Sequence, residues 1–350
     1  MTPADLSLTV LHAVRRAVDD GALQVEVPSR VAVERPRPGG SGDYASNVAL
    51  TLARAARRPP LDVAAILRER LHRSPGIAAV EITGPGFLNF RLDDTAQQGL
   101  VRDVLRSGLR YGHLEPSGQV AQPVYRADVR AAVTADAVRR ILVSQGYLVR
   151  TACEDAADPD WAELDVRIEA QGARGHLPTD IAPLPVRHTP RELLDTLGPD
   201  AARWGLLASA GHDHASVGPS LLRQHEDNPL FRVRYAHSRA RALTRSAAQL
   251  GFHTQAGEPL HTVPAPALTR ALGDHPAVLA AAARHRAPDR VARHLEVVAD
   301  ALLDFQHTVL PLGDEKPSAA HRSRRALAEA AGTVLAGGLA LLGISAPEHI

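Results

Sequence analysis

Apolar residues recur every three or four positions near the start of the chain, which predicts an amphipathic helix. Its apolar positions are Leu6, Val10, Leu11, Val14 and Val18. A second helical stretch is expected from Val48 up to Pro59-Pro60, and a third helix near 61–71. Two short apolar runs, 78–82 and 87–92, flank Gly84-Pro85-Gly86 and predict strands joined by a tight turn. The first part of the chain is therefore predicted to be α+β.

The middle of the chain predicts a small parallel α/β unit. A strand at 123–125, a helix at 132–144 and a strand at 146–149 follow one another, which is the order of a βαβ unit. The stretches 154–160 and 177–190 are expected to be loops. Thr189-Pro190-Arg191-Glu192 combines a capping threonine, a proline at the first helical position and a glutamate that can bond back. It predicts a helix over 190–196, with another over 199–209.

Beyond Asp227 the apolar pattern is helical almost throughout, with breaks expected at 251–266, 275–276, 288 and 310–317. Long periodic runs at 290–305 and 324–342 predict a helical bundle. The predicted fold class is therefore α+β and mainly helical. The predicted domains are residues 1–115, 120–225 and 226–350.

Composition agrees with this fold and removes several chemistries. Aromatic residues are only 3% of the chain, so alanine, leucine and valine must fill the core, which suits helices. The formal charge is +1, so any nucleic-acid surface must be a local patch. Lys316 is the only lysine, which excludes a phosphate-loop lysine or a Schiff base anywhere else in the chain.

Cysteine and histidine usage points to no metal and no disulfide. Cys153 is the only cysteine, which excludes a disulfide framework and a cysteine-based zinc cluster. His212, His214, His225 and Glu226 form a loose cluster, but the chain has 17 histidines and such groupings arise freely. The N-terminus does not resemble a signal peptide, and no apolar segment is long enough to span a membrane. A cytoplasmic protein without metal or membrane contact is expected.

Arginines crowd the segment that begins at Asn228. Five of them and no acid lie between Asn228 and Gly257. At helical spacing Arg234, Arg241 and Arg245 share a stripe, which Arg232 and Arg239 flank and in which Tyr235 and His237 are interleaved. Such a helix can clamp phosphates and stack on exposed bases. The alternative is a solvated face whose arginines pair with the acidic middle of the chain, and spacing alone leaves both open.

Several motifs together resemble arginyl-tRNA synthetases. Residues 228–239 resemble the helix that joins the catalytic and anticodon-binding domains of that family, and 339–350 resemble its C-terminus. Three blocks, 42–50, 58–60 and 84–90, look like the family's N-terminal additional domain, in the family's order. The resemblance implies that domain, a Rossmann-like catalytic domain and a helical anticodon-binding (DALR-type) bundle. It also implies tRNA as partner and ATP with magnesium as cofactors.

The chain departs from the family at the catalytic signatures. The positions that match the histidine-x-glycine-histidine signature are Tyr125, Arg126, Ala127 and Asp128, so both histidines and the glycine are absent. Ala127 would crowd adenine, and Asp128 would bring negative charge toward the phosphates. Residues 180–186 match the family's lysine-rich or arginine-rich loop and contain neither lysine nor glycine. We therefore expect a shortened Rossmann-like remnant without catalytic residues, in which ATP and magnesium are not held.

The arginine-rich helix also departs from the family's usual sequence. Arg232 and Arg234 stand where the family usually has tyrosine and glutamine, which line the site for arginine and the tRNA end. Two cations would repel a cationic amino acid and attract a phosphate. Phe87 and Asn89 match the strand that approaches the tRNA elbow, although a core position explains Phe87 equally well. The candidate tRNA-binding residues are Arg232, Arg234, Tyr235, His237, Arg239, Arg241, Arg245, Phe87, Asn89, Pro347 and Ile350.

The leading expectation is a non-catalytic tRNA-binding protein, a regulator or delivery partner that recognises a tRNA such as an arginine acceptor. The arginines at the start of the last domain are expected near the acceptor arm or inner corner of the tRNA, and residues 347–350 nearer the anticodon. Two alternatives stay open. One is a protein-interaction scaffold or synthetase partner without tRNA binding, and the other is a residual arginine-tRNA ligase-type enzyme that uses ATP.

Overall fold

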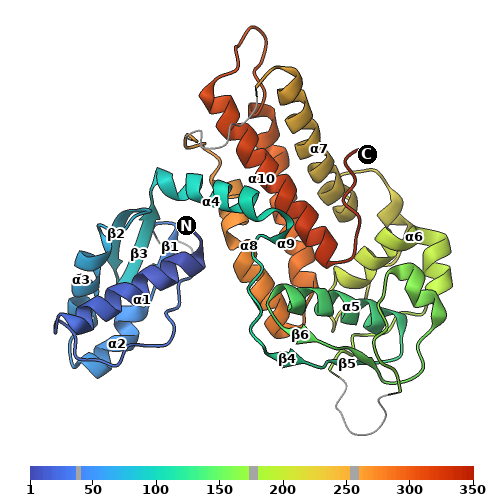
Figure 1. Cartoon of the computed structure of the whole chain (residues 1–350), viewed down its shortest axis with the longest axis horizontal. Coiled ribbons are helices and arrows are strands. Elements are labelled where there is room, and N and C mark those ends of the chain that lie inside the picture. The colour runs from blue at the N-terminus through green and yellow to red at the C-terminus, as the bar shows by residue number, and fades with distance from the viewer. Residues whose placement is uncertain (37–40, 173–179, 253–259) are drawn as a thin grey trace. The chain divides into compact units, whose positions relative to one another are not determined.

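The computed structural model describes residues 1–36, 41–172, 180–252 and 260–350. The chain packs as two compact units (Figure 1). The first is Met1–Arg102 with Leu260–Thr262, and the second is Asp103–Pro259 with Val263–Ile350. The predicted loop over 177–190 and the predicted break over 251–266 lie partly outside the described residues. Each unit is described by itself.

The first unit combines three helices with an antiparallel sheet, as predicted. The helices are α1 (Pro3–Asp19), α2 (Val48–Ala56) and α3 (Pro60–Leu71), and the strands are β1 (Tyr44–Ser46), β2 (Ile77–Thr83) and β3 (Phe87–Leu92). The strand order is β1-β3-β2. Gly86 in the β2–β3 turn has φ +132°, and a Cβ there would come within 3.0 Å of the Pro60 carbonyl oxygen, so the turn requires glycine.

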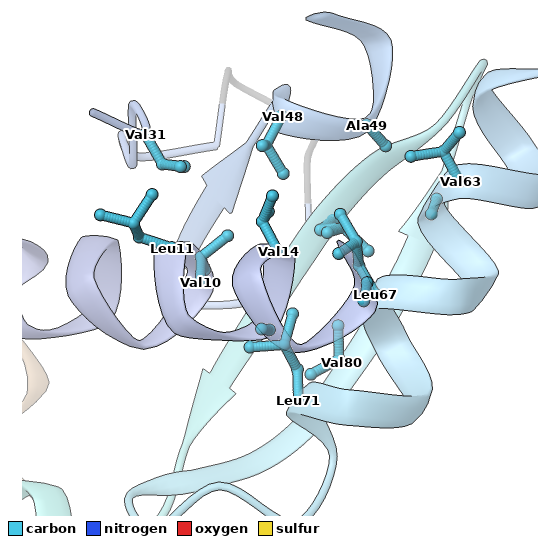
Figure 2. Close-up of a cluster of buried hydrophobic side chains, with 14 of the residues drawn as sticks. Val10, Leu11, Val14, Val31, Val48, Ala49, Val63, Leu67, Leu71 and Val80 are labelled. Atoms are coloured by element: carbon cyan, nitrogen blue, oxygen red, sulfur yellow. The ribbon is translucent and has the colours of Figure 1, made fainter. Parts of the chain in front are cut away.

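The apolar stripe of α1 forms the core of this unit. Thr2 caps the helix and Asp5 bonds back to its backbone, so the helix begins where the apolar period begins. Val14 lies with Leu67 and Leu71 of α3 in the cluster that Figure 2 shows, and Val10 with Leu11 extends it along α1. Burial of these side chains fixes α1 against α3 and leaves the polar faces of both helices to solvent.

The second unit begins with the predicted βαβ arrangement. The strands are β4 (Val120–Ala121), β5 (Val124–Tyr125), β6 (Leu148–Val149) and β7 (Ala152–Cys153), and α5 (Val129–Ser144) connects the two pairs. β4 pairs with β6 and β5 pairs with β7, both in parallel. Ile181 adds a parallel bridge on the other side of Tyr125. The prediction of a parallel unit is confirmed, and its strands are very short.

A kinked helix follows this small sheet. It is α6 (Pro190–Leu207), with Thr189 and Glu192 forming the predicted capping box. Gly198 has a non-helical φ of 71° just before Pro199, so α6 consists of the two predicted helical segments joined at a kink. Short 3₁₀ helices lie at Gly108–Arg110, Pro159–Leu164, Pro219–Leu222 and Gln306–Thr308.

Four long helices form the bundle that the sequence predicts. They are α7 (Pro229–Gln249), α8 (Pro266–His285), α9 (Asp289–Phe305) and α10 (Ala319–Leu341). Figure 1 shows α10 beside α7 and α9. A Cβ added at Gly332 of α10 would come within 2.8 Å of Ala240 on α7, so the absence of a side chain there permits the close approach of the two helices. The predicted mainly helical α+β class is confirmed.

The predicted break at 275–276 is wrong, because α8 runs through Pro276 without interruption. A proline inside a helix leaves the carbonyl four residues earlier without its backbone donor. Here that carbonyl belongs to Leu272, and the hydroxyl of Tyr111 donates to it at 3.2 Å. A tertiary hydrogen bond thus replaces the missing one.

The helix α4 (Asp94–Ser107) leads from the first unit into the second. The second unit includes residues from Asp103 onward, whereas the sequence predicts a domain boundary near residue 115. The difference arises because residues after α4 pack on the bundle: a Cβ on Gly337 would lie 3.0 Å from the Leu109 carbonyl oxygen, and Tyr111 bonds Leu272. No helix in the described part of the chain is long and apolar enough to cross a membrane.

Candidate nucleic-acid interface

The arginine-rich helix begins at a well-defined cap. The side-chain oxygen of Asn228 accepts from the backbone N–H of Leu230, and Pro229 occupies the first helical position. The amide nitrogen of Asn228 donates to the carbonyls of Leu221 and Arg223, each at 2.8 Å. These bonds fix the start of α7, and therefore the direction in which each following arginine points.

Two of the arginines face the bundle. Arg232 forms ion pairs with Glu296 at 3.3 Å and Asp300 at 3.0 Å, both on α9. Arg239 donates from Nε to the side-chain oxygen of Gln306 at 2.6 Å. Burial raises the pKa of Glu296, although the Arg232 charge opposes this shift. These two arginines link α7 to neighbouring parts of the bundle.

The other three arginines lie against residues 344–350, called here the C-terminal segment. Arg241 contacts the Glu348 carboxylate at 2.8 Å and Arg245 contacts it at 3.8 Å. Hydrogen bonding from Arg241, and then its charge, lower the pKa of Glu348. Arg234 pairs with Asp200 at 3.4 Å and bonds Ser345, which also bonds Asp200. The predicted stripe exists, and the chain's own carboxylates line it.

The two aromatic rings of the stripe lie in different surroundings. His237 is buried, and its Nδ1 lies 2.9 Å from the carbonyl oxygen of Pro347. Burial lowers the pKa of His237, although the Pro347 carbonyl opposes this. Tyr235 is exposed and stacks on Phe231 at a centroid distance of 5.6 Å. Tyr235 is therefore the ring of the two that a base could reach.

The C-terminal segment and the arginine stripe lie together. Pro347 and Ile350 line a pocket of about 430 Å³ together with Phe231 and Arg234 of α7. The sequence-based expectation placed the stripe and residues 347–350 at different parts of the tRNA. In the structure His237 contacts Pro347 and Arg241 contacts Glu348, so the two sets of candidate residues adjoin each other.

Residues 125–128, the positions expected to match the family's first catalytic signature, lie where β5 ends and α5 begins. Tyr125 is fully buried against Trp161, while Arg126 and Ala127 are exposed. The Asp128 side chain caps α5, accepting from the backbone N–H of Ala131 at 2.9 Å. Burial raises the pKa of Asp128, although hydrogen bonds from the backbone of Ala131 and Arg130 oppose this shift. A helix N-terminus attracts anions, and here the chain's own carboxylate occupies that end, so these residues do not fit a phosphate.

The segment at the second signature is fixed by hydrogen bonds. The backbone N–H groups of Asp180 and Ile181 both donate to the carbonyl of Val124, at 2.8 and 3.0 Å. Farther along, Leu184 donates to the carbonyl of Gly211 at 2.8 Å. Asp180 also pairs with Arg286 at 2.6 Å. These contacts give the segment a structural place beside the small sheet.

Sequence reasoning missed two buried arginines that hold the second unit together. Arg130 on α5 donates to five backbone carbonyls, those of Leu184, Leu206, Ser209, Ala210 and Asp213. Arg203 on α6 lies 2.8 Å from the fully buried carboxylate of Asp136, which also contacts Arg139 and Arg140. The helical spacing of Asp136 with Arg139 and Arg140 is visible in the sequence, whereas the partners of Arg130 lie 54 to 83 residues away.

The two candidate residues of the first unit differ in exposure. Phe87 begins β3 and is 39% exposed. Asn89 is buried, and its amide nitrogen donates to the Thr83 hydroxyl at 2.6 Å across the β2–β3 pair. Asn89 therefore holds the strands together, and Phe87 is the residue of the two that solvent reaches.

No metal cluster occurs among the described residues. No group of three or more histidine, cysteine, aspartate or glutamate side chains in that part of the chain is arranged to hold an ion. His212 and His225 instead lie near acids of their own loops, Asp213 at 3.8 Å and Asp227 at 3.1 Å.

Comparisons with known proteins agree with the motifs at both ends of the chain. Residues 8–92 match the arginyl tRNA synthetase N terminal domain, and residues 233–350 match the DALR anticodon binding domain. The signature positions 125–128 and 180–186 lie between these two ranges.

Relatives match over the whole chain. A protein named arginine–tRNA ligase from Frankia alni is 30% identical, and one of the same name from Renibacterium salmoninarum is 27% identical, each over 100% of both chains. The first alignment spans 552 residues and this chain has 350, so the relative contains segments that this chain lacks.

The fold matches as well. The arginyl-tRNA synthetase structure from Thermus thermophilus superposes with a TM-score of 0.72 at 15% identity, over 100% of both chains. At that identity the superposition supports the fold alone, whereas the Frankia alni relative and the two domain matches support the family. On this evidence the chain belongs to the arginyl-tRNA synthetase family.

Proposed function

We propose that this protein binds tRNA and does not aminoacylate it. The observation that carries the loss of catalysis is Asp128, whose carboxylate caps α5 at the position where the family's signature ends. A negative group at this helix end repels the triphosphate that adenylation requires. ATP and magnesium are therefore not part of the proposed activity.

The segment that matches the second signature supports the same proposal. Catalysis in the family relies on a loop rich in lysine or arginine, and residues 180–186 have neither. The backbone of Ile181 is bonded to the strand that carries Tyr125, and the Leu184 carbonyl accepts from buried Arg130. This segment supplies no cation to a phosphate.

The bundle supports the binding half of the proposal. It matches an anticodon binding domain, and α7 presents Arg241 and Arg245 at 43% and 40% side-chain exposure. Tyr235 is exposed on the same helix. Guanidinium groups bind phosphates through paired N–H donors, and an exposed ring can stack on a base. A tRNA with arginine identity is the proposed ligand, and the cytoplasm the proposed location.

Pyrophosphate exchange tests the catalytic half. The purified chain is assayed with arginine, ATP, magnesium and added tRNA, with the Frankia alni relative named arginine–tRNA ligase as positive control. We expect exchange at the level of buffer for this chain. Arginine-dependent exchange above that level would favour the residual-enzyme alternative and overturn the proposal.

A second candidate is a protein-interaction scaffold without tRNA binding. The observation that favours it is that the five arginines of α7 all have partners within the chain: Glu296 and Asp300 for Arg232, Asp200 for Arg234, Gln306 for Arg239, and Glu348 for Arg241 and Arg245. Paired arginines offer less charge to a polyanion.

Competition separates these two candidates. Filter binding of total tRNA is measured with and without excess poly-U, and the retained tRNA is sequenced. Specific recognition keeps a defined tRNA bound under competition, whereas a scaffold releases it as it would release any polyanion. Free displacement by poly-U would reject the tRNA-binding half of the proposal.

A further inference from the structure

The polar faces of α1 and α3 border an open, basic pocket in the first unit. Its volume is about 580 Å³, and none of its lining residues is acidic. Arg15 and Arg16 come from the last turns of α1, and Arg70 and Arg73 come from the end of α3 and the turn after it. The rest of the lining consists of the hydroxyl residues Thr9 and Ser74, together with His12 and Pro75. Four guanidinium groups with two hydroxyls make a site for an oxyanion.

The packing of the unit explains why these charges gather. Val10 and Val14 bury the apolar stripe of α1 against Leu67 and Leu71 of α3 (Figure 2). Residues three and four positions apart share a face of a helix, so Arg15 and Arg16 lie on the turn above His12 at the edge of that contact. The apolar contact therefore brings the basic ends of two helices together.

Two of the arginines are held in place by the protein. Arg70 donates to the Ile66 carbonyl at 3.0 Å and pairs with Asp20 at 3.1 Å, and its side chain is 19% exposed. Its Nε is buried and has no hydrogen-bond partner in the described part of the chain. Arg16 donates to the carbonyl of Arg70 at 3.0 Å. Little side-chain entropy remains to be lost there when a ligand binds.

The other two arginines keep their charges available. Within the described residues, neither Arg15 nor Arg73 pairs with an acid, and Arg73 contacts the ring of His72 at 3.2 Å. A purely structural explanation exists for Arg16, because a cation near a helix C-terminus stabilises the helix. It does not explain Arg15 and Arg73, which satisfy no carbonyl in that part of the chain.

We propose that this pocket binds phosphate groups of an RNA backbone, as a contact separate from α7. The choice of RNA rests on the proposed function, since the chain is proposed to bind tRNA, whereas the phosphate chemistry rests on the pocket alone. The four cations come from two different helix ends, which suits successive phosphates of a strand. Phe87 lies on the sheet of the same unit and does not line this pocket.

The experiment compares two double variants of the full chain. Arg15→Gln with Arg73→Gln removes the two available cations of the pocket, and Arg30→Gln with Arg54→Gln removes two exposed cations of the same unit that do not line it. The probes are total tRNA, by filter binding over a range of salt, and inorganic tripolyphosphate, by calorimetry at low salt. Thermal unfolding reports whether each variant is folded.

We expect the pocket variant to bind tripolyphosphate more weakly than the control variant, and its salt slope for tRNA to be lower by about two. Equal tripolyphosphate binding by the two variants would overturn the proposal that the pocket binds phosphate groups. If tRNA binds all three proteins with equal affinity and slope, the pocket is not an RNA contact, and the proposed function stands. If the wild-type chain binds no tRNA, the proposed function fails, and RNA is rejected as the source of the phosphate.

Discussion

The hydroxyl of Tyr111 and the carbonyl of Leu272 form a buried hydrogen bond of 3.2 Å that lets α8 contain a proline. Pro276 has no N–H to give to Leu272, and the hydroxyl supplies the missing donor from a residue 161 positions earlier in the chain. The Tyr111 ring also stacks on His275 at a centroid distance of 5.9 Å. The segment after α4 is thereby joined to the bundle.

This pair gives a double-mutant prediction. Tyr111→Phe should lower the free energy of unfolding by about 1–3 kcal/mol, because it leaves the Leu272 carbonyl buried without a donor. In a Pro276→Ala background alanine returns the backbone N–H, so the same Tyr111→Phe change should cost less. Urea denaturation of the four proteins measures the difference. Equal costs in both backgrounds would show that the hydroxyl does not compensate for the proline.

Asp136 is the centre of a second buried network, and removing it should be costly. Its carboxylate lies 2.8 Å from Arg139, Arg140 and Arg203, and Arg203 also donates to the carbonyls of Leu164 and Leu342. Asp136→Ala should destabilise the second unit by about 3–5 kcal/mol, because buried Arg203 loses its counter-charge. Asp195→Ala breaks an exposed pair with Arg191 and should change stability little. Urea denaturation compares the two.

The pH dependence of this network has a defined sign. Burial alone would raise the pKa of Asp136, but Arg203, Arg140 and Arg139 outweigh it and lower the pKa below the usual 3.8. A carboxylate whose pKa falls on folding stabilises the protein above its unfolded pKa. That contribution should therefore be lost only below about pH 4. If Asp136→Ala and the wild type are equally stable at neutral pH, the network is not a source of stability.

His275 should make the protein sensitive to milder acid. It is fully buried in α8 and stacks on Tyr111 and on His294 of α9. Burial first, and then the charges of His294 and His113, lower its pKa well below 6.5. The folded state keeps the ring neutral while the unfolded state protonates it, so stability should fall as pH drops below about 6.5. One such group contributes at most about 1.4 kcal/mol per pH unit.

A substitution isolates this effect from the other histidines. His275→Phe keeps a ring between Tyr111 and His294 and removes the titrating group. Denaturation at several pH values between 7.5 and 5 should show a shallower loss of stability in this variant than in the wild type. His188→Phe, at an exposed position, should leave the wild-type dependence unchanged. The same acid dependence in all three proteins would contradict a role for His275.

The local features of this fold were predictable from the sequence, and the long-range ones were not. The period of Leu6, Val10 and Val14 predicted α1, and Thr189 with Glu192 predicted the start of α6, because helix faces and caps depend on neighbouring residues. The break predicted at Pro276 failed because Tyr111, far away in sequence, supplies a donor. Local rules do not include tertiary partners.

The candidate site follows the same division. Helical spacing predicted that Arg234, Arg241 and Arg245 share one stripe of α7. The structure agrees, because all three contact the C-terminal segment. The counter-charge of this stripe was not predictable, because Glu348 is 107 residues from Arg241 and no spacing rule connects them. The alternative reading expected these arginines to pair with acids from the middle of the chain. Of such acids, Asp200 alone, which pairs with Arg234, is a partner in the described part of the chain.

Glu348 provides a test of whether the α7 arginines bind phosphate. Glu348→Gln removes the carboxylate that pairs with Arg241 at 2.8 Å and Arg245 at 3.8 Å, so both guanidinium groups become available. If they bind phosphates, this variant should bind tRNA more tightly, and the salt slope should rise by up to about two.

The double variant Arg234→Gln with Arg241→Gln should have the opposite effect on tRNA binding. It should reduce the affinity for tRNA without altering which tRNA is preferred. Filter binding over a range of salt, with Glu329→Gln as a control on α10, measures both effects. Because the Glu348 side chain is 53% exposed, circular dichroism should show an intact fold in each variant. An unchanged dissociation constant and slope in both variants would mean that the arginines and Glu348 serve only to hold the C-terminal segment on α7.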